Sequence, residues 1–244
     1  MRRLPVLDEA DIRKVLVVVA HPDDIDFGGA GTIARLTEAG AEVVYCLVTD
    51  GDAGGFDRLV DNGGMAALRR AEQTAAAKCV GVGDLRFLGY QDGMVEQTLG
   101  LRRDIARVIR QVRPDLVVTS SPDRNYERLG PSHPDHRAVG GATLDAVYPD
   151  ARNPYAFPEL LTDEGLEAWT VREVWLSGGT AVNHYVDVTS TVGRKIAALR
   201  AHESQTSNIP DLDGMIKGWL SANAAAAGLP EGAYAEAFQR VVTA

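Results

Sequence analysis

The sequence predicts an α/β fold that is Rossmann-like, with a mostly parallel central sheet between helices. Short apolar runs rich in Val and Leu alternate with longer amphipathic segments, and such continuous runs are typical of strands buried on both faces. At the start of the chain, over 15–49, a strand, a helix and a second strand follow one another. This order is a βαβ unit, which requires parallel strands and a right-handed crossover.

The expected elements alternate along most of the chain. Buried strands are expected at 15–20, 42–49, 84–88, 116–119, 171–176 and 185–188. Helices are expected at 28–39, 65–80, 101–112, 134–147 and 191–202, and the tail from 210 onward is typical of one or two small-residue helices. We therefore expect a single α/β domain over 1–206. A helical extension over 207–244 would pack on that domain or on a partner subunit of a homo-oligomer.

The composition is that of an ordinary globular protein, with 45% hydrophobic and 24% charged residues among 244. The net charge of -9 argues against nucleic acid and against an anionic membrane surface as partners, so a small molecule is expected instead. No run is long enough to span a membrane, and the amino terminus lacks the apolar segment of a secretory signal. With only two isolated cysteines, Cys46 and Cys79, these features indicate a cytoplasmic protein.

The first strand runs directly into a polar cluster. Residues 15–29 read VLVVVAHPDDIDFGG, so His21, Asp23 and Asp24 follow the carboxyl end of a buried strand. In open α/β sheets this edge is where ligands bind. An imidazole and two carboxylates are donors that a zinc-type metal takes, whereas a turn would need only Pro, Asp and Gly. Taken alone, the stretch leaves two interpretations open: a metal site, or a turn with a chance histidine.

A second cluster of the same type follows another buried strand. After the strand at 116–119, a long polar loop ends in SHPDH at 132–136. Pro134 suits the first turn of a helix, which places His136 in that turn. Both clusters follow parallel strands, so both are expected at the same edge of the sheet. Two HPD tripeptides among five histidines make coincidence a poor explanation.

The donors of the two clusters can be divided by role. A catalytic zinc takes three protein ligands and keeps a fourth position open, and His21, Asp24 and His136 would supply such a set. Asp23 and His133 would then be free for proton transfer, one as base and one as acid. The carboxylates that remain to orient imidazoles are Asp135 and Asp26.

Two other kinds of site fit the sequence less well. The glycine-rich loops at 28–31 and 51–55 lack both the G-x-G-x-x-G pattern and a G-K-[ST] ending, which disfavours a dinucleotide site. A closed structural zinc site would need four Cys or His ligands, and the sequence offers no such set. The sequence therefore favours a catalytic metal.

Six short motifs follow one another along the chain: AHPDD (20–24), TDG (49–51), Arg-x-x-Glu (69–72), FLGYQDG (87–93), SHPDHRAVG (132–140) and AHESQ (201–205). In their order and spacing they resemble the motifs of a known family, the PIG-L or LmbE-like zinc-dependent N-acetylglucosaminyl deacetylases, which include mycothiol-pathway deacetylases. The paired histidine motifs are the specific ones, and the shorter motifs would be weak alone.

The resemblance implies a role for each matching position. His21, Asp24 and His136 correspond to the ligands of Zn²⁺, with another divalent metal such as Fe²⁺ as an alternative. Asp23 corresponds to the general base and His133 to the general acid, with Asp135 as the partner that orients the acid histidine. Arg69 aligns with an arginine that holds substrate in relatives. Further candidates for substrate contact are Asp92, Tyr126 and His184.

The sequence departs from the family pattern at two positions. Ile25 stands where many relatives have Glu, and Asp26 follows it. Pro131 stands where some relatives carry an oxyanion-stabilising tyrosine, and Tyr126 or Tyr185 could replace that tyrosine, or zinc and His133 could suffice. The role of His202, in AHESQ, is expected to be structural or to support a ligand rather than to bind the metal.

These observations lead to one functional hypothesis with two alternatives. The chain is expected to be a zinc-dependent hydrolase that removes the N-acetyl group of an N-acetylglucosaminyl-type substrate, releasing acetate and a free amine. The alternatives are an amidase acting on a mycothiol-like thiol conjugate and a non-catalytic sugar-binding module. The substrate walls are expected from three segments, 51–64, 121–131 and 148–161.

Overall fold

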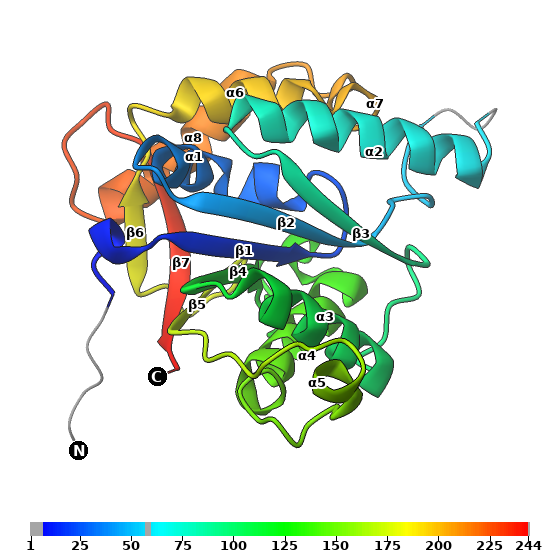
Figure 1. Cartoon of the computed structure of the whole chain (residues 1–244). Coiled ribbons are helices and arrows are strands. Elements are labelled where there is room, and N and C mark those ends of the chain that lie inside the picture. The colour runs from blue at the N-terminus through cyan, green and yellow to red at the C-terminus, as the bar shows by residue number, and fades with distance from the viewer. Residues whose placement is uncertain (1–6, 57–59, 244) are drawn as a thin grey trace.

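The computed structural model describes residues 7–56 and 60–243, and within them seven strands form one sheet (Figure 1). The spatial order is β3-β2-β1-β4-β5-β7-β6. The first five strands in the chain pair in parallel, whereas β7 is antiparallel to both of its neighbours. The strands are β1 Lys14–Val19, β2 Glu42–Thr49, β3 Asp84–Tyr90, β4 Leu116–Ser120, β5 Glu173–Ser177, β6 His184–Asp187 and β7 Ala235–Val242. The predicted α/β fold with a mostly parallel sheet is confirmed.

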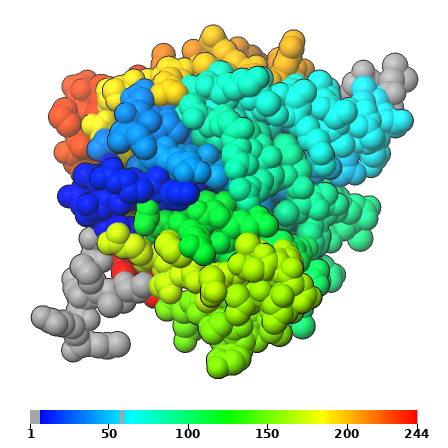
Figure 2. All heavy atoms as spheres, in the orientation of Figure 1, coloured from blue at the N-terminus to red at the C-terminus, as the bar shows by residue number. Residues whose placement is uncertain are grey.

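Helices cover both faces of this sheet. The described helices are α1 Asp24–Glu38, α2 Asn62–Cys79, α3 Leu99–Val112, α4 Pro134–Asp145, α5 Glu159–Thr162, α6 Val192–Arg200, α7 Glu203–Thr206 and α8 Leu212–Ala226. In Figure 1, α1, α2, α6 and α8 lie above the sheet and α3 and α4 below it. The space-filling view shows the segment around α5, in yellow-green, on the outer surface of the lower layer (Figure 2).

The central strands are buried on both faces, as their continuous apolar sequence predicts. In β1, Val15 and Val17 pack with the α1 and α6 layer, while Leu16 and Val18 pack with the α3 and α4 layer. Each strand therefore contributes to two cores, one on each side of the sheet. This arrangement explains why valine and leucine alternate with each other rather than with polar residues.

The strand order reverses between β1 and β4, which are hydrogen-bonded neighbours. Such a reversal opens a crevice at the carboxyl ends of the two strands. The AHPDD stretch leaves β1 at this point, and the loop after β4 leads to SHPDH at the start of α4. The topology thus brings the two histidine clusters to one place.

The first helix begins earlier than predicted. Helix α1 starts at Asp24 rather than at 28, and its glycines lie inside the helix. A Cβ atom on Gly31 would lie 2.9 Å from Cβ of Val188, so small size here allows close packing rather than a chain reversal. As a result, Asp23 is the N-cap residue and Asp24 lies in the first turn.

The prediction that the tail is helical is wrong from Ala235 onward. After α8, residues Ala235–Val242 form β7, which inserts between β5 and β6 and completes the sheet. The stretch AEAFQRVV is short, and its small and polar residues gave no clear apolar run. Its strand conformation depends on pairing with two strands from elsewhere in the chain, such as Ala237 opposite Tyr185.

Candidate metal centre and active site

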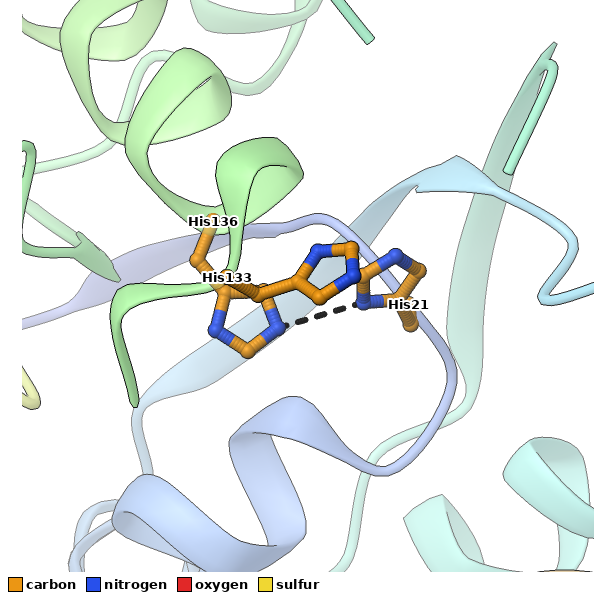
Figure 3. Close-up of side chains that lie close together, drawn as sticks. All are labelled: His21, His133 and His136. Atoms are coloured by element: carbon orange, nitrogen blue, oxygen red, sulfur yellow. Dashed lines mark hydrogen bonds between the residues drawn. The ribbon is translucent and has the colours of Figure 1, made fainter. Parts of the chain in front are cut away.

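Three histidines from two loops point toward one another at the switch point (Figure 3). His21 follows β1, while His133 and His136 stand at the start of α4. The three ring centroids lie 5.0 to 5.3 Å apart. Pro134 opens the helix at its first position, which directs both imidazoles of this segment to the crevice.

The donor atoms of His21, Asp24 and His136 lie close together. Nδ1 of His21 lies 3.2 Å from Nε2 of His136, and Nε2 of His136 lies 3.0 Å from Oδ1 of Asp24. Nδ1 of His21 lies 3.5 Å from the other carboxylate oxygen of Asp24, Oδ2. Tetrahedral zinc with its usual bond lengths requires donor separations of about 3.3 Å. His21 and His136 also group with His133 as residues close enough to share a metal ion.

In His21 and in His136, the ring nitrogen that faces away from the other histidine contacts oxygen acceptors. Nε2 of His21 lies 3.0 Å from Oδ1 of Asp92 and 3.2 Å from Oδ2 of Asp135. Nδ1 of His136 lies 3.2 Å from the carbonyl oxygen of Pro131. Such contacts fix the ring orientation and make the inward nitrogen a better ligand.

Asp135 faces a different histidine from the one predicted. Its fully buried carboxylate accepts the main-chain N–H of Gly93 at 2.7 Å and contacts His21 rather than His133. Only its main-chain N–H reaches His133, donating to Nδ1 at 3.3 Å. The first turn of α4 directs the Asp135 side chain toward the loop after β3, where it accepts the N–H of Gly93. The Asp135 carboxylate is therefore placed to orient the ring of His21 rather than that of His133.

The carboxylates set the protonation of the metal-free centre. Burial lowers the pKa of His21, but Asp24, Asp135 and Asp92 raise it to about 12. Burial raises the pKa of Asp24, yet His136 and His21 hold it well below its ordinary range. Without a metal, protons on the imidazoles balance these carboxylates. A divalent cation would replace those protons, so binding is expected to release them.

Asp23 is separated from the three donors and held by other partners. Its backbone has a φ of 93°, a left-handed conformation that is uncommon outside glycine, and its N–H donates to Oε1 of Gln73 at 2.8 Å. One carboxylate oxygen accepts from Arg69 at 3.1 Å. Burial raises the pKa of Asp23 to about 6, against the lowering effect of Arg69. A pKa near neutrality suits a general base.

Arg69 lies in the cavity wall but is occupied by protein groups. It is 4% exposed and, besides Asp23, donates to the carbonyl oxygens of Pro22 and Gly51. A Cβ on Gly51 would lie 2.4 Å from the guanidinium, which explains the glycine of the TDG motif. The structure thus places Arg69 first of all as a support for Asp23.

Asp26 and His202 lie beneath the site. Oδ2 of Asp26 accepts from Nε2 of Gln73 at 2.8 Å and lies 2.8 Å from Nε2 of His202. Asp26 and His202 are fully buried, and Ile25 packs in the core. Asp26 thereby fixes the amide that receives the N–H of Asp23, while His202 does not contact the donors of the centre.

Burial and the neighbouring imidazoles of His21 and His136 lower the pKa of His133. Its Nδ1 accepts the N–H of Asp135, which in the neutral ring leaves the proton on Nε2. His133 is the most exposed of the three histidines and lines the cavity. The pKa of His133 is shifted down and that of Asp23 up, so the two pKa values move toward each other.

A cavity of about 820 Å³ adjoins the centre. Asp23, Asp24, Asp92, His133 and His136 line it, together with parts of the two loops predicted to form walls, 51–64 and 121–131. Further lining comes from 177–182, α8 and β7, which the sequence analysis missed. The alternating apolar and small residues of α8 were the only available signal, and they equally suited a core helix.

The third predicted wall, 148–161, does not line the cavity. This segment packs against α3, where the Arg110 guanidinium donates to the carbonyl oxygens of Asp150, Asn153 and Ala156. The buried arginine binds the irregular chain on the far side of the sheet from α8. The proline-rich sequence thus forms a structural loop rather than a substrate wall.

Two predicted substrate-contact residues, Tyr126 and His184, and the possible oxyanion donor Tyr185 also lie outside the cavity lining. Tyr126 is 84% exposed on the loop after β4. His184 lies on β6, with its ring 4.4 Å from that of Trp175, and Tyr185 follows it on the same strand. Neither tyrosine is placed to donate to an oxyanion at the metal centre. Asp92, the fourth candidate, lines the cavity but contacts His21.

The fold and the centre define a class, the α/β proteins that carry a candidate His/Asp metal site at the switch point of a Rossmann-like sheet. The sequence profile of the PIG-L family, described as GlcNAc-PI de-N-acetylase, matches residues 16–147. The chain belongs to this family.

Comparison with individual proteins agrees with this membership. Diacetylchitobiose deacetylase of Thermococcus kodakarensis is 34% identical over 80% of this chain and 71% of its own length. A 1D-myo-inositol 2-acetamido-2-deoxy-alpha-D-glucopyranoside deacetylase of Kineococcus radiotolerans is 30% identical over 94% of this chain and 77% of its own. The structure of N,N'-diacetylchitobiose deacetylase from Pyrococcus horikoshii superimposes with a TM-score of 0.85 at 30% identity, covering 95% and 85% of the two chains.

Proposed function

We propose that this chain is a zinc-dependent deacetylase that hydrolyses the acetamide of an N-acetylglucosaminyl derivative to acetate and a free amine. The observation that carries the proposal is the gathering of His21, Asp24 and His136, with donor atoms 3.0 to 3.5 Å apart, in a cavity that Asp23 and His133 also line. The deacetylase names of the relatives support the substrate class.

The metal would be held by His21, Asp24 and His136, with Zn²⁺ preferred for this mixture of nitrogen and oxygen donors and Fe²⁺ as the alternative. When bound, such an ion polarises a carbonyl and makes water more acidic. Asp92 and Asp135 would keep His21 oriented and would offset part of the cation's charge.

In the proposed reaction, two side chains of the protein move protons. Asp23, held by Arg69 and Gln73, accepts a proton from the attacking water. His133, which lines the cavity, acts in its protonated form and delivers a proton to the amide nitrogen as the bond to the acetyl carbon breaks. Because neither Tyr126 nor Tyr185 lines the cavity, stabilisation of the oxyanion falls to the metal and to His133.

A non-catalytic sugar-binding module would need no separate base and acid beside a three-donor centre. The retained pair Asp23 and His133 therefore favours catalysis. An amidase acting on a thiol conjugate would use the same centre, and the two reactions differ only in the acyl and amine groups. We propose the acetamide because the relatives named above are all deacetylases.

The decisive experiment is an assay of amine release from a panel of N-acetylated amino sugars and thiol-conjugate amides. The purified chain is stripped with a chelator and then supplied with Zn²⁺ or Fe²⁺. We expect metal-dependent amine release from N-acetylglucosaminyl compounds. Release from the thiol conjugates alone would replace this function by the amidase, and no turnover of any amide despite metal binding would contradict catalysis.

We further propose that the protein acts in the cytoplasm on small molecules. Within 7–56 and 60–243, no helix combines the length and apolarity that a membrane crossing requires. The net charge of -9 disfavours nucleic acid as a partner. Assembly into a homo-oligomer is testable by light scattering on the purified chain.

A further inference from the structure

Asp23 occupies the N-cap position of helix α1, yet its side chain does not cap the helix. An aspartate at this position normally has an extended backbone, and its carboxylate accepts an N–H of the first helical turn. Asp23 instead has a φ of 93° and a ψ of -24°, and its carboxylate makes no capping hydrogen bond. The carboxylate is therefore free to line the cavity and to pair with Arg69.

The main chain of Asp23 is held by hydrogen bonds on both sides. Its carbonyl oxygen accepts the N–H groups of Asp26 and Phe27, at 2.8 and 3.0 Å, as at the start of any helix. Its N–H donates to Oε1 of Gln73, which lies on α2, 50 positions further along the chain. The contact with Gln73 is thus the one that depends on how α2 packs near α1.

The amide of Gln73 can hold the N–H of Asp23 in only one of its two orientations. Its oxygen accepts and its NH₂ group donates, and a rotation by about 180° exchanges them. Nε2 of Gln73 donates to Oδ2 of Asp26 at 2.8 Å, and a carboxylate can only accept. Asp26 therefore selects the orientation in which Oε1 faces Asp23. Because Gln73 and Asp26 are both fully buried, bulk water does not compete for these bonds.

His202 fixes the carboxylate of Asp26 in turn. Nε2 of His202 lies 2.8 Å from Oδ2 of Asp26, the oxygen that also binds Gln73. Oδ1 of Asp26 and Nδ1 of His202 have no hydrogen-bond partner among the described residues. In the neutral imidazole the proton then lies on Nε2, facing Asp26. Donors on one oxygen alone thus set the direction of the carboxylate.

We propose that Gln73, Asp26 and His202 are positioning residues for the general base. They hold Asp23 in its left-handed conformation, so that its carboxylate serves the reaction instead of capping α1. The proposal rests on the deacetylase function above and assigns these three residues a role in its kcat. None of the three lines the cavity, so none is expected to bind substrate.

The test uses variants that remove or keep single hydrogen bonds. Gln73→Leu misplaces the base without touching substrate or metal, so kcat should fall roughly 10- to 100-fold while KM and Zn²⁺ content stay close to those of wild type. Asp26→Leu should act alike, whereas Asp26→Asn, whose amide oxygen still accepts both donors, should keep most of kcat. His202→Phe removes one of the two donors and should cause a smaller fall. The matched control is Gln111→Leu, which removes a glutamine bonded to Arg86 on the other face of the sheet.

A double-mutant cycle separates positioning from general damage to the fold. In the Asp23→Asn background, where the base is already lost, Gln73→Leu should lower the remaining kcat by less than about twofold. An equal proportional fall in both backgrounds would overturn the proposal, as would a wild-type kcat in Gln73→Leu.

Crystal structures of the variants test the proposal without turnover. In Gln73→Leu and Asp26→Leu, residue 23 should leave the left-handed region or turn its carboxylate to cap α1, and in Asp26→Asn it should do neither. This result supports the positioning role even if no acetamide is hydrolysed. A left-handed Asp23 with an unmoved carboxylate in Gln73→Leu contradicts it.

Discussion

Asp23 and Asp24 are neighbours in sequence, yet they face different partners. Asp24, in the first turn of α1, contacts His21 and His136, while Asp23 occupies a left-handed backbone conformation and pairs with Arg69. A non-glycine residue in this conformation costs about 1–3 kcal/mol and persists only when its surroundings hold it. The amide of Gln73 and the guanidinium of Arg69 provide that support.

Asp23→Asn should abolish turnover while leaving metal binding intact. The amide keeps the size of the side chain but cannot accept the proton, so kcat is expected to fall roughly 10²- to 10⁴-fold. Metal content, measured by mass spectrometry of the purified protein, should match that of wild type because Asp23 is not among the three donors. Activity within a few-fold of wild type would show that another group is the base.

His136→Ala should instead remove the metal. This change takes away one of three donors, so the stoichiometry of Zn²⁺ after dialysis against a weak chelator is expected to drop well below one per chain. The control is His184→Ala, which removes an imidazole that stacks on Trp175 outside the centre. Equal Zn²⁺ content in the two variants would refute the ligand assignment.

At the scale of elements, helix α1 is held in its middle by a buried ion pair. Nζ of Lys195, on α6, donates to the carbonyl oxygens of Asp26 and Phe27 and to Glu236 of β7 at 2.7 to 2.8 Å. The Glu236 carboxylate accepts the N–H groups of Gly31 and Thr32. Carbonyl oxygens and N–H groups of helix α1 are thus hydrogen-bonded to side chains of α6 and β7. This clamp positions the first turn of α1, which carries Asp24.

Lys195→Met is expected to destabilise the fold by about 3–5 kcal/mol, because it leaves the Glu236 charge buried without its partner. Urea unfolding measures this loss. Zn²⁺ affinity, measured by competition with a chromophoric chelator, should fall as well, since the turn that bears Asp24 loses its anchor. Lys195→Arg should be milder on both measures. A Lys195→Met variant with wild-type stability would show that the pair is not a clamp.

At the scale of the whole molecule, the tail of the chain ties the sheet together. Arg240 of β7 forms an ion pair with Glu173 of β5, at 2.6 Å, in a fully buried position for the glutamate. The same carboxylate accepts the N–H of Leu7 and the indole N–H of Trp175. The Glu173 carboxylate therefore links Leu7, which precedes β1, to Arg240 of the last strand, β7.

Stability should decline in acid through Glu173. Although burial raises the pKa of this carboxyl, Arg240 and the N–H donors of Leu7 and Trp175 lower it further, to below its ordinary value. Its contribution is therefore complete above the unfolded pKa of about 4.3 and is lost as pH falls through the lower folded pKa. The gap in Tm between wild type and Glu173→Gln should be large at pH 7 and shrink toward pH 3. A gap independent of pH would contradict this.

Much of the fold could be predicted from local patterns. Continuous apolar runs marked the central strands because those strands are buried on both faces, and Pro134 marked the start of α4. The strand β7 was missed because its conformation comes from pairing with β5 and β6. The positions of Tyr126 and His184 relative to the cavity could not be read from sequence, because they depend on where separate elements cross.

The sequence by itself determined the order of the parallel strands and of the long helices between them, the family, and the histidines and carboxylates that gather at the switch point. These features follow from periodicity and from residues placed directly after strands, which are local properties. Only the tertiary structure decided that Asp135 faces His21, that Asp26 supports Asp23 through Gln73, and that α8 lines the cavity. Each of these contacts joins segments about 40 or more residues apart, and its direction depends on how whole elements pack.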